Sequence, residues 1–248
     1  MESRDGPTYW GDAETIAAWT ASCEPRESPV AMMENPMFWR LAGDVSGARV
    51  LDLGCGDGRL GKEILDSGAV QYHGVDPSAP LLARAPAEAD DLTFEQGTIE
   101  RFDPRKASFE LVVSRLALHY VADLAAAIGA MARALVPGGA LVYTLEHPAI
   151  TSHESELSRD QRGVRSRWVI DDYFASGRRE IDWINGCVTK YHRPLEDHFR
   201  AVTENGLHVV SLEEGRPLEA SFGGHRAEYE RRARIPLFLG IRAELPGP

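Results

Sequence analysis

Residues 50–61 constrain the fold of this chain most, because they read as an apolar strand, a glycine-rich turn and the start of a helix. The turn contains Gly54, Gly56 and Gly58, which let the backbone adopt positive φ and approach a ligand closely. The helix that follows presents N–H groups without intrahelical partners toward the turn. The segment therefore predicts a ligand-binding strand–loop–helix unit of a parallel α/β sheet.

Apolar runs alternate with helix-like segments from residue 47 onward, a pattern that is typical of βαβ units. We predict strands over residues 48–53, 71–75, 92–96, 109–114 and 140–145. We predict helices over residues 59–67, 79–85 and 122–135, with a Pro-Gly-Gly turn after the last of them. A helix over 195–205, a strand over 208–213 and an apolar run over 235–241 extend the pattern. The expected fold class is α/β, with a Rossmann-like, mostly parallel seven-stranded sheet flanked by helices.

Two segments lie outside this alternation. Residues 1–46 combine polar residues and prolines with several aromatic side chains, so we expect a helical N-terminal cap. Residues 47–248 would form the Rossmann-like domain. Within it, residues 147–193 carry aromatic residues of their own, and we expect this insertion after strand five to cover the substrate.

The charge and the cysteines exclude several classes of protein. Lys and Arg total 27 against 38 Asp and Glu, a net charge of -11 that argues against nucleic acid or an anionic membrane as a partner. The three cysteines have no C-x-x-C spacing and suggest neither a disulfide framework nor a zinc site. The pair Asp171 and Asp172 has no further metal ligand at convincing spacing, so no metal is expected. The sequence shows no signal-peptide pattern and no long apolar stretch, so we expect a cytoplasmic protein.

Asp76 points to a cofactor that contains a nucleoside. It ends the second predicted strand, beside the first loop, where a carboxylate can accept both hydroxyls of a ribose. Residues 56–61 satisfy G-x-G-x-x-G, so a nicotinamide dinucleotide stays open as the cofactor. Asp52, however, would repel a pyrophosphate and attract an ammonium group, which favours a cofactor that carries an amino acid.

Residues 47–146 resemble the class I S-adenosylmethionine-dependent methyltransferases. The resemblance rests on Asp-Leu-Gly-Cys-Gly-Asp-Gly at 52–58, Asp76, the segments 109–114 and 118–120, and Leu-Val-Pro-Gly-Gly at 135–139. It implies methyl transfer from S-adenosyl-L-methionine, with S-adenosyl-L-homocysteine as product. It also implies that the loop 54–58 contacts the methionine moiety, Asp76 the ribose, residues 97–99 the adenine, and the backbone at 114–115 the ammonium. The cofactor-binding residues that it implies are Asp52, Gly54, Cys55, Gly56, Gly58, Asp76, Pro77, Thr98, Ile99, Ser114 and Arg115.

The adenine segment departs from the pattern of this family, whose members commonly have an acidic residue after the glycine that ends strand three. Here Thr98 and Ile99 follow Gly97. A threonine oxygen can still accept a hydrogen bond and the isoleucine can pack on the purine, so we expect altered adenine contacts with binding retained.

The acceptor site should lie at the carboxyl ends of strands four and five, under the insertion. The segments 146–148, 171–174 and 190–193 resemble a less described subset of these enzymes, without identifying a substrate. Basic side chains here favour an acidic acceptor, and aromatic ones a planar acceptor, although solvated arginines and ordinary packing explain them as well. We expect these residues to contact the acceptor: Glu146, Trp168, Tyr173 and Arg193.

Three histidines are candidates for the general base, since imidazole titrates near neutral pH. We rank them in the order His147, His192 and His119. His147 follows strand five beside Glu146, although it also fits a structural strand-end turn before Pro148. His192 could reach inward from the insertion, or form a hydrogen bond at the start of a helix. His119 lies near the cofactor, where a structural role is the alternative.

The expected function is methyl transfer to a small-molecule acceptor, at oxygen or nitrogen rather than carbon, by in-line displacement. Three alternatives remain open. The chain could bind the cofactor and catalyse a reaction without methylation, such as a cyclisation. It could be a nicotinamide-dependent oxidoreductase, although it has no Tyr-x-x-x-Lys pair, or a module that only binds or regulates.

Overall fold

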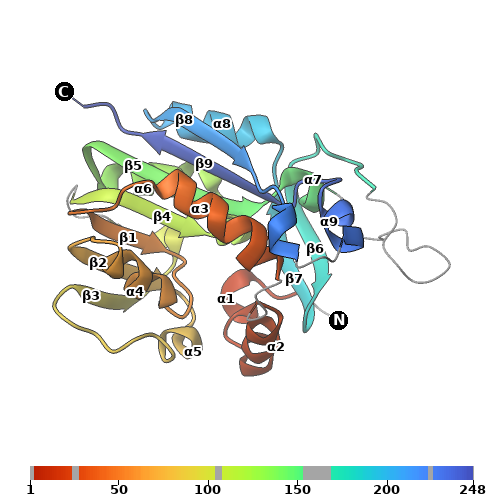
Figure 1. Cartoon of the computed structure of the whole chain (residues 1–248), viewed down its shortest axis with the longest axis horizontal. Coiled ribbons are helices and arrows are strands. Elements are labelled where there is room, and N and C mark those ends of the chain that lie inside the picture. The colour runs from red at the N-terminus through yellow and green to blue at the C-terminus, as the bar shows by residue number, and fades with distance from the viewer. Residues whose placement is uncertain (1–2, 24–27, 104–107, 153–168, 223–225, 248) are drawn as a thin grey trace.

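A computed structural model of the chain describes residues 3–23, 28–103, 108–152, 169–222 and 226–247. Its centre is a seven-stranded sheet with the order β3-β2-β1-β4-β5-β9-β8 (Figure 1). The strands are β1 Arg49–Leu53, β2 Gln71–Asp76, β3 Leu92–Gln96, β4 Phe109–Arg115, β5 Leu135–Glu146, β8 His208–Glu214 and β9 Phe238–Glu244. Strands β1 to β5 are parallel, and β9 runs antiparallel to both β5 and β8. The predicted fold class is confirmed.

Strand boundaries follow the sequence pattern except at two places. Strand β5 begins at Leu135, five residues before the predicted start, because Leu135 already pairs with Phe109 of β4. The Pro-Gly-Gly turn therefore lies inside the strand, with Gly138 donating to Leu245 O at 2.9 Å. The last strand begins at Phe238, three residues after the predicted start of the apolar run.

Two hydrophobic clusters cover the two faces of the sheet, because neighbouring strand residues point to opposite sides. On one face, Leu51 and Val112 pack with α6 (Leu124–Ala134) and α8 (Leu195–Glu204). On the other face, Val50 and Val113 pack with α3 (Asn35–Ala42) and α4 (Arg59–Asp66). The sheet is thus a central layer between two layers of helices, as Figure 1 shows.

The N-terminal residues divide between two places. Helix α3 is part of a helical layer, where Gly240 of β9 leaves room for Leu41. The preceding elements α1 (Gly6–Tyr9) and α2 (Ala13–Cys23) lie beyond the carboxyl ends of the strands in Figure 1. A π-helical segment, Val30–Glu34, leads directly into α3. Residues 1–46, predicted as one cap, thus contribute both to a helical layer and to the region beyond the strand ends.

The insertion after β5 contains the short helix α7 (Pro148–Thr151) and a hairpin of β6 (Gly177–Trp183) with β7 (Gly186–His192). Arg4 holds the N-terminus on this hairpin, since its N–H donates to Cys187 O at 3.1 Å and its carbonyl accepts from Thr189 N at 2.8 Å. The remaining elements are α5 Ala79–Leu82, α9 Arg226–Arg232 and the 3-10 turns Ile99–Arg101, Leu118–Tyr120 and Glu219–Phe222.

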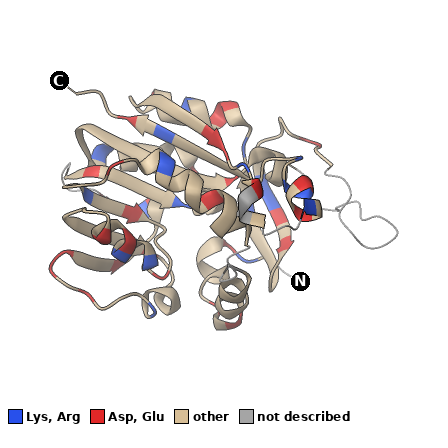
Figure 2. Ribbon diagram, in the orientation of Figure 1, with Lys and Arg blue, Asp and Glu red and all other residues tan. Residues whose placement is uncertain are grey.

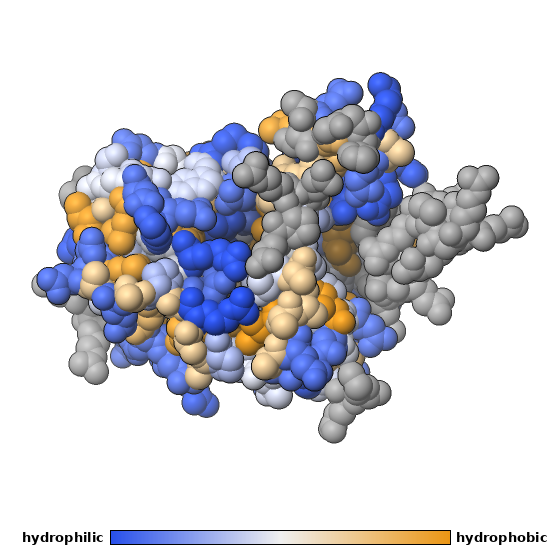
Figure 3. Space-filling model, turned by 60° about the horizontal axis from the view of Figure 1, so that its bottom comes forward, coloured by the Kyte–Doolittle hydropathy of each residue, from blue (hydrophilic) through white to orange (hydrophobic). Residues whose placement is uncertain are grey.

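The surface shows neither a basic stripe nor a broad apolar face in the views drawn. Figure 2 shows Lys and Arg interspersed with Asp and Glu along the described elements. Figure 3 shows hydrophobic residues scattered among hydrophilic ones on the face turned forward. Among the described residues, no helix has the length and apolarity needed to cross a membrane.

The contact of α3 with the sheet gives a test of the fold. Leu41 is 2% exposed and packs on β9, so Leu41→Ala should lower the free energy of unfolding by about 3 kcal/mol. Urea titration followed by circular dichroism measures this value. Leu218→Ala, at a side chain that is 52% exposed, is the control and should change stability by no more than about 0.5 kcal/mol. Equal losses in the two variants would contradict the packing of α3.

Candidate active site

A cavity of about 760 Å³ lies at the carboxyl ends of β1, β2, β4 and β5, within the size range of small-molecule sites. One half is lined by the glycine loop and the residues that follow β2 and β3. The other half is lined by aromatic and aliphatic side chains of α1, α2, the segment after β4 and the hairpin. The parallel sheet predicts a ligand site at this edge.

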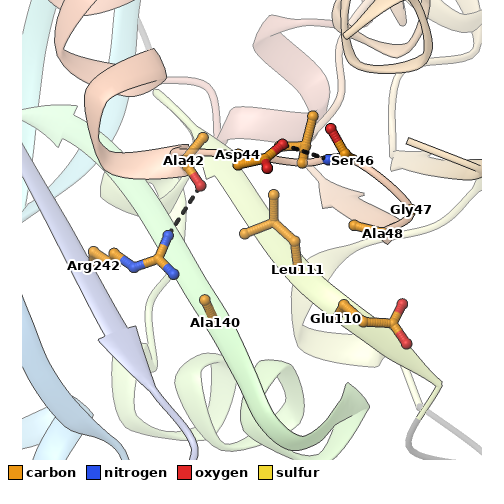
Figure 4. Close-up of a pocket in the computed structure, with 10 residues that line it drawn as sticks. Ala42, Asp44, Ser46, Gly47, Ala48, Glu110, Leu111, Ala140 and Arg242 are labelled. Carbon is orange, nitrogen blue, oxygen red and sulfur yellow. Dashed lines mark hydrogen bonds between the residues drawn. The ribbon is translucent and has the colours of Figure 1, made fainter. Parts of the chain in front are cut away.

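A second cavity, of about 190 Å³, lies near the opposite ends of β1 and β4 (Figure 4). The polar groups that Figure 4 joins are satisfied within the protein: Arg242 donates to Ala42 O at 3.0 Å, and Ser46 N donates to Asp44 at 2.9 Å. This small cavity therefore offers less to a ligand than the larger one. Across the described ranges, no group of three His, Cys, Asp or Glu side chains is placed to bind a metal ion.

The glycine loop approaches its neighbours too closely for side chains at some positions and leaves space at others. A Cβ on Gly54, which has φ of 87°, would lie 2.4 Å from Ala117 Cβ. A Cβ on Gly56, which has φ of 60°, would meet nothing within 4 Å, because this glycine borders the cavity. The backbone at Gly56 is therefore open to a ligand.

Asp76 ties this loop to the end of β2. Its Oδ2 accepts from Gly56 N at 2.9 Å, and its Oδ1 accepts from Ser78 N at 2.8 Å. Burial raises the pKa of Asp76, while these two backbone donors act in the opposite direction. Each oxygen keeps lone-pair capacity for a further donor, and the residue lines the cavity.

Asp52 is a buried carboxyl group with an unused acceptor. Tyr72 OH donates to its Oδ2 at 2.6 Å, whereas its buried Oδ1 has no hydrogen-bond partner in the described part of the chain. Burial raises the pKa of Asp52 to about 7, against the effect of the hydrogen bond from Tyr72. Because Asp52 lines the cavity, it fits a ligand that brings a positive donor such as an ammonium group.

A buried ion pair closes the cavity beside β4. Arg115 donates to Glu34, at 3.1 Å from Nε to Oε1, and also to Asn35 Oδ1 at 3.0 Å. Thr144 OH donates to the same Glu34 Oε1 at 2.6 Å. Burial opposes the charge of Arg115, but Glu34 and the other carboxylates outweigh it and raise the pKa of the guanidinium. Leu116, the next residue, has φ of 53°, a conformation that is uncommon outside glycine.

Nine of the eleven residues expected to bind the cofactor line this cavity. They are Asp52, Gly54, Cys55, Gly56, Asp76, Pro77, Thr98, Ile99 and Arg115. Gly58 and Ser114 do not line it, and Ser114 OH instead donates to Leu53 O at 2.7 Å inside the sheet. Burial raises the pKa of the Cys55 thiol, which keeps it protonated and unsuited to nucleophilic chemistry.

The aromatic half of the cavity contains a second buried ion pair. Lys190, 1% exposed, places Nζ 2.7 Å and 2.8 Å from the two carboxylate oxygens of Glu146. Its Nζ also lies 4.2 Å from the ring centre of Trp183 and 5.7 Å from that of Tyr120. Burial alone would raise the pKa of Glu146, but the Lys190 ammonium lowers it below its usual value. Glu146 therefore stays ionised at neutral pH.

The three candidate histidines occupy different environments. Only His119 lines the cavity, and its buried Nδ1 has no hydrogen-bond partner within the described ranges. His147 caps α7 by accepting from Ala149 N at 3.1 Å, and its Nε2 lies 3.1 Å from Glu214. Both ring nitrogens of His192 are engaged, with Thr151 Oγ1 and Tyr173 O each at 2.8 Å. Neither of these two is among the lining residues, so the geometry favours His119, the last of the three in the sequence ranking.

The expected acceptor residues are also divided. Glu146 lines the cavity, whereas Tyr173 and Arg193 do not. Arg193 donates to Val121 O and Ala122 O, and thereby holds the start of α8 against the segment after β4. Trp168 lies outside the described residues. Glu34 was not predicted as a site residue, because it belongs to no motif and its partner, Arg115, lies 81 positions later in the sequence.

Comparisons with known proteins agree with this geometry. Residues 50–139 match the family model described as "Methyltransferase domain". A solved S-adenosylmethionine-dependent methyltransferase of Mesorhizobium loti is 31% identical, with a TM-score of 0.77 over 88% of this chain and 98% of that one. A ubiquinone biosynthesis O-methyltransferase of Bradyrhizobium sp. is 39% identical over 187 residues, covering 68% of this chain and 72% of the relative. A malonyl-[acyl-carrier protein] O-methyltransferase of Pseudescherichia vulneris is 33% identical over 135 residues, or 54% and 53% of the two chains.

With this fold and these relatives, the chain belongs to the class I S-adenosylmethionine-dependent methyltransferases. S-adenosylmethionine is its cofactor, and it is an enzyme of methyl transfer. This result settles the choice left open by the G-x-G-x-x-G pattern against a nicotinamide dinucleotide.

The raised pKa of Asp52 predicts how stability depends on pH. The pKa of Asp52 is higher in the folded than in the unfolded chain, about 7 against about 4. The free energy of unfolding of the protein therefore decreases as pH rises between these two values. Asp52→Asn removes this titration, so the stability of the variant relative to wild type should be greater above pH 7 than at pH 4, by about 4 kcal/mol. Thermal or urea unfolding across this pH range measures the difference.

Asp66→Asn is the control, because Asp66 is exposed and paired with Lys62 on the surface of α4. Its pH profile should follow that of wild type. Parallel profiles for wild type and Asp52→Asn would show that the carboxyl group is not held in the buried state described above.

Proposed function

We propose that this methyltransferase methylates an oxygen atom of a small, uncharged and largely apolar acceptor. The observation that carries the proposal is a single cavity that joins the glycine loop to an aromatic half containing a neutral ion pair. The cofactor would lie along Asp52, Gly56, Asp76 and Ile99, and the acceptor against Trp10, Trp183 and their neighbours. When bound, S-adenosylmethionine supplies a methyl carbon, which gains the acceptor's lone pair while the C–S electron pair returns to sulfur.

The charges of the cavity support an uncharged acceptor. Eight acidic and four basic side chains are among the described lining residues. Each basic group is paired: Arg59 with Asp57, Arg115 with Glu34, Lys190 with Glu146 and Arg232 with Glu228. The acidic excess suits a sulfonium and an ammonium, whereas a phosphorylated or carboxylated acceptor would meet no unbalanced cation here. We therefore favour a neutral acceptor over the acidic one that the arginines of the sequence suggested.

Oxygen is favoured by two observations. The relatives at 39% and 33% identity are named O-methyltransferases, which supports the same atom class for this chain. The aromatic half also contains an ammonium donor, Lys190, and a neutral imidazole, His119, whose Nδ1 has no partner within the described ranges; a donor beside an imidazole matches a hydroxyl group.

His119 is our candidate for the general base. Burial lowers its pKa to about 3, which keeps the imidazole neutral at pH 7 but also weakens it as a base. The nearby Glu146 carboxylate acts in the opposite direction and would stabilise the imidazolium once it forms. His147 and His192 lack this access, because they do not line the cavity.

Calorimetry with purified protein tests the cofactor half of the proposal. We expect binding of S-adenosylmethionine and S-adenosylhomocysteine, and no response to NADH. Asp76→Asn should weaken cofactor binding by about 1.5–3 kcal/mol, the scale of hydrogen bonds to a charged group. Asp66→Asn, which changes an exposed carboxylate that pairs with Lys62 on α4 and does not line the cavity, is the matched control.

Formation of S-adenosylhomocysteine tests the acceptor half, with panels of phenols, alcohols, amines and carboxylic acids of similar size. Turnover confined to hydroxyl compounds would support the proposal. Turnover with amines or carboxylates alone would refute it.

His119→Gln should lower kcat by about 10² to 10⁴, because a positioned base contributes about that factor. Its affinity for S-adenosylmethionine should stay within about twofold of wild type, as measured by calorimetry. His147→Gln is the comparison variant and should keep most of kcat. If His147→Gln loses activity while His119→Gln keeps it, the assignment of the base is wrong.

A further inference from the structure

We propose that Lys190 binds the acceptor's oxygen and stabilises it as an anion, so that the enzyme selects acidic hydroxyl groups of the phenol or enol type. This inference rests on the proposed transfer to oxygen and assigns the substrate class of the same site. It starts from a buried ion pair, Glu146 with Lys190, whose two residues come from β5 and β7 and both line the cavity.

The ammonium of Lys190 has a donor to spare. An ammonium carries three N–H groups, and the two shortest contacts of Nζ are both with Glu146, at 2.7 Å and 2.8 Å. The ring of Trp183 lies against it at 4.2 Å and contributes no oxygen acceptor. As far as the described residues go, the third N–H is therefore available to an oxygen of a bound acceptor.

The stability of the fold does not account for this pair. Burying two charges costs about as much as their attraction returns, and apolar side chains of similar size would stabilise the wall at least as well. A lysine that is 1% exposed, in a wall that includes Trp10, Tyr120 and Trp183, thus indicates a use for its charge.

The pair suits a hydroxyl better than a permanent anion. Since Glu146 already balances Lys190, a phosphate or carboxylate would add net negative charge to a buried site. A hydroxyl enters neutral, and in the reaction its proton moves to His119 while the oxygen keeps the O–H electron pair. The negative charge therefore develops on the oxygen, next to Lys190, as the proton leaves, and it is neutralised when an oxygen lone pair forms the new O–C bond.

The acidity of the acceptor follows from the groups available. A phenol ionises near pH 10, as the tyrosine side chain does, close to the range of a lysine ammonium. An ammonium group beside a phenol can lower the pKa of its hydroxyl and so increase the fraction of phenolate. An aliphatic alcohol is too weak an acid to ionise in this way. The aromatic side chains of the cavity also suit a phenol. The ring of Trp10 lies at 79° to that of Trp183 and at 84° to that of Tyr120, and these rings form a corner in which a planar ring can pack.

The probe for this inference is 4-nitrophenol, whose phenolate absorbs visible light and whose hydroxyl ionises near neutral pH. With S-adenosylhomocysteine bound to the wild-type enzyme, the bound probe should ionise at lower pH than the free probe, with about tenfold more phenolate at a given pH. No methyl group is transferred in this experiment, so the readout is independent of turnover.

Two variants separate the charges of the pair. Glu146→Gln keeps the ammonium and removes its counter-charge, so the bound probe should be at least as ionised as in wild type. The double variant Lys190→Met/Glu146→Gln removes both charges without leaving one of them buried and unpaired, and should return the probe to the ionisation of the free phenol. Lys62→Met, which breaks an exposed pair with Asp66, is the control and should behave as wild type. Melting temperatures and binding of S-adenosylhomocysteine establish that each variant is folded.

The inference is overturned if 4-nitrophenol does not bind, or if it ionises alike in wild type and the double variant. The proposed transfer to oxygen fails separately, in the acceptor panels, if S-adenosylhomocysteine forms only with amines or carboxylates. Turnover of aliphatic alcohols, with no shift of the probe, would support transfer to oxygen and refute the role of Lys190.

Discussion

The ion pair of Glu34 with Arg115 is the interaction on which the arrangement of the site depends. Glu34 is fully buried, and a carboxylate in that position is tolerated only if its oxygens are satisfied. Arg115 and Thr144 supply the donors, and they are paired neighbours on β4 and β5, so one carboxylate fastens the N-terminal segment to the ends of two strands. The ring of Phe38 covers the guanidinium at 4.4 Å, which brings α3 into the same contact. The wall of the cavity formed by residues 28–35 is held in place by this pair.

The acceptor half is built from segments that are distant in the sequence. Trp10 and Trp183 meet with ring centres 5.8 Å apart, and the backbone of Arg4 bridges to the strand that carries Lys190. Neither α1, a helix of four residues, nor an isolated hairpin is stable alone, so each depends on the other and on the sheet edge below. The cofactor half, by contrast, is made by consecutive loops of the parallel sheet. The geometry of the cofactor half therefore follows from the local sequence, whereas the geometry of the acceptor half follows from tertiary contacts.

This difference explains what could be predicted from the sequence. The periodic apolar runs indicated the strands and helices, and the glycine loop with Asp52 and Asp76 indicated where a cofactor binds, because all of these are local signals. The order of the histidines could not be read in this way. His147 stands at the end of a strand, where ligands bind in this fold, but Pro148 turns the chain so that the imidazole caps α7 instead. Lys190 could be listed as a basic residue, but its partner Glu146 lies 44 positions earlier, and only the fold brings them together.

Two residues that break the rules of stable folding line the cavity and are among those to which we assign chemistry. A buried polar atom without a partner costs stability. Of the six such atoms in the described part of the chain, Asp52 Oδ1 and His119 Nδ1 are on side chains that line the cavity. Their unused hydrogen-bonding capacity is satisfied when a ligand supplies the missing donor. In Asp52 the same burial that raises its pKa removes water as a competitor for that donor. We expect an isosteric apolar residue at either position to raise the free energy of unfolding of the ligand-free protein and to lower its affinity for a ligand. The buried polar atom costs stability in the free protein, and that cost is removed only when a ligand binds.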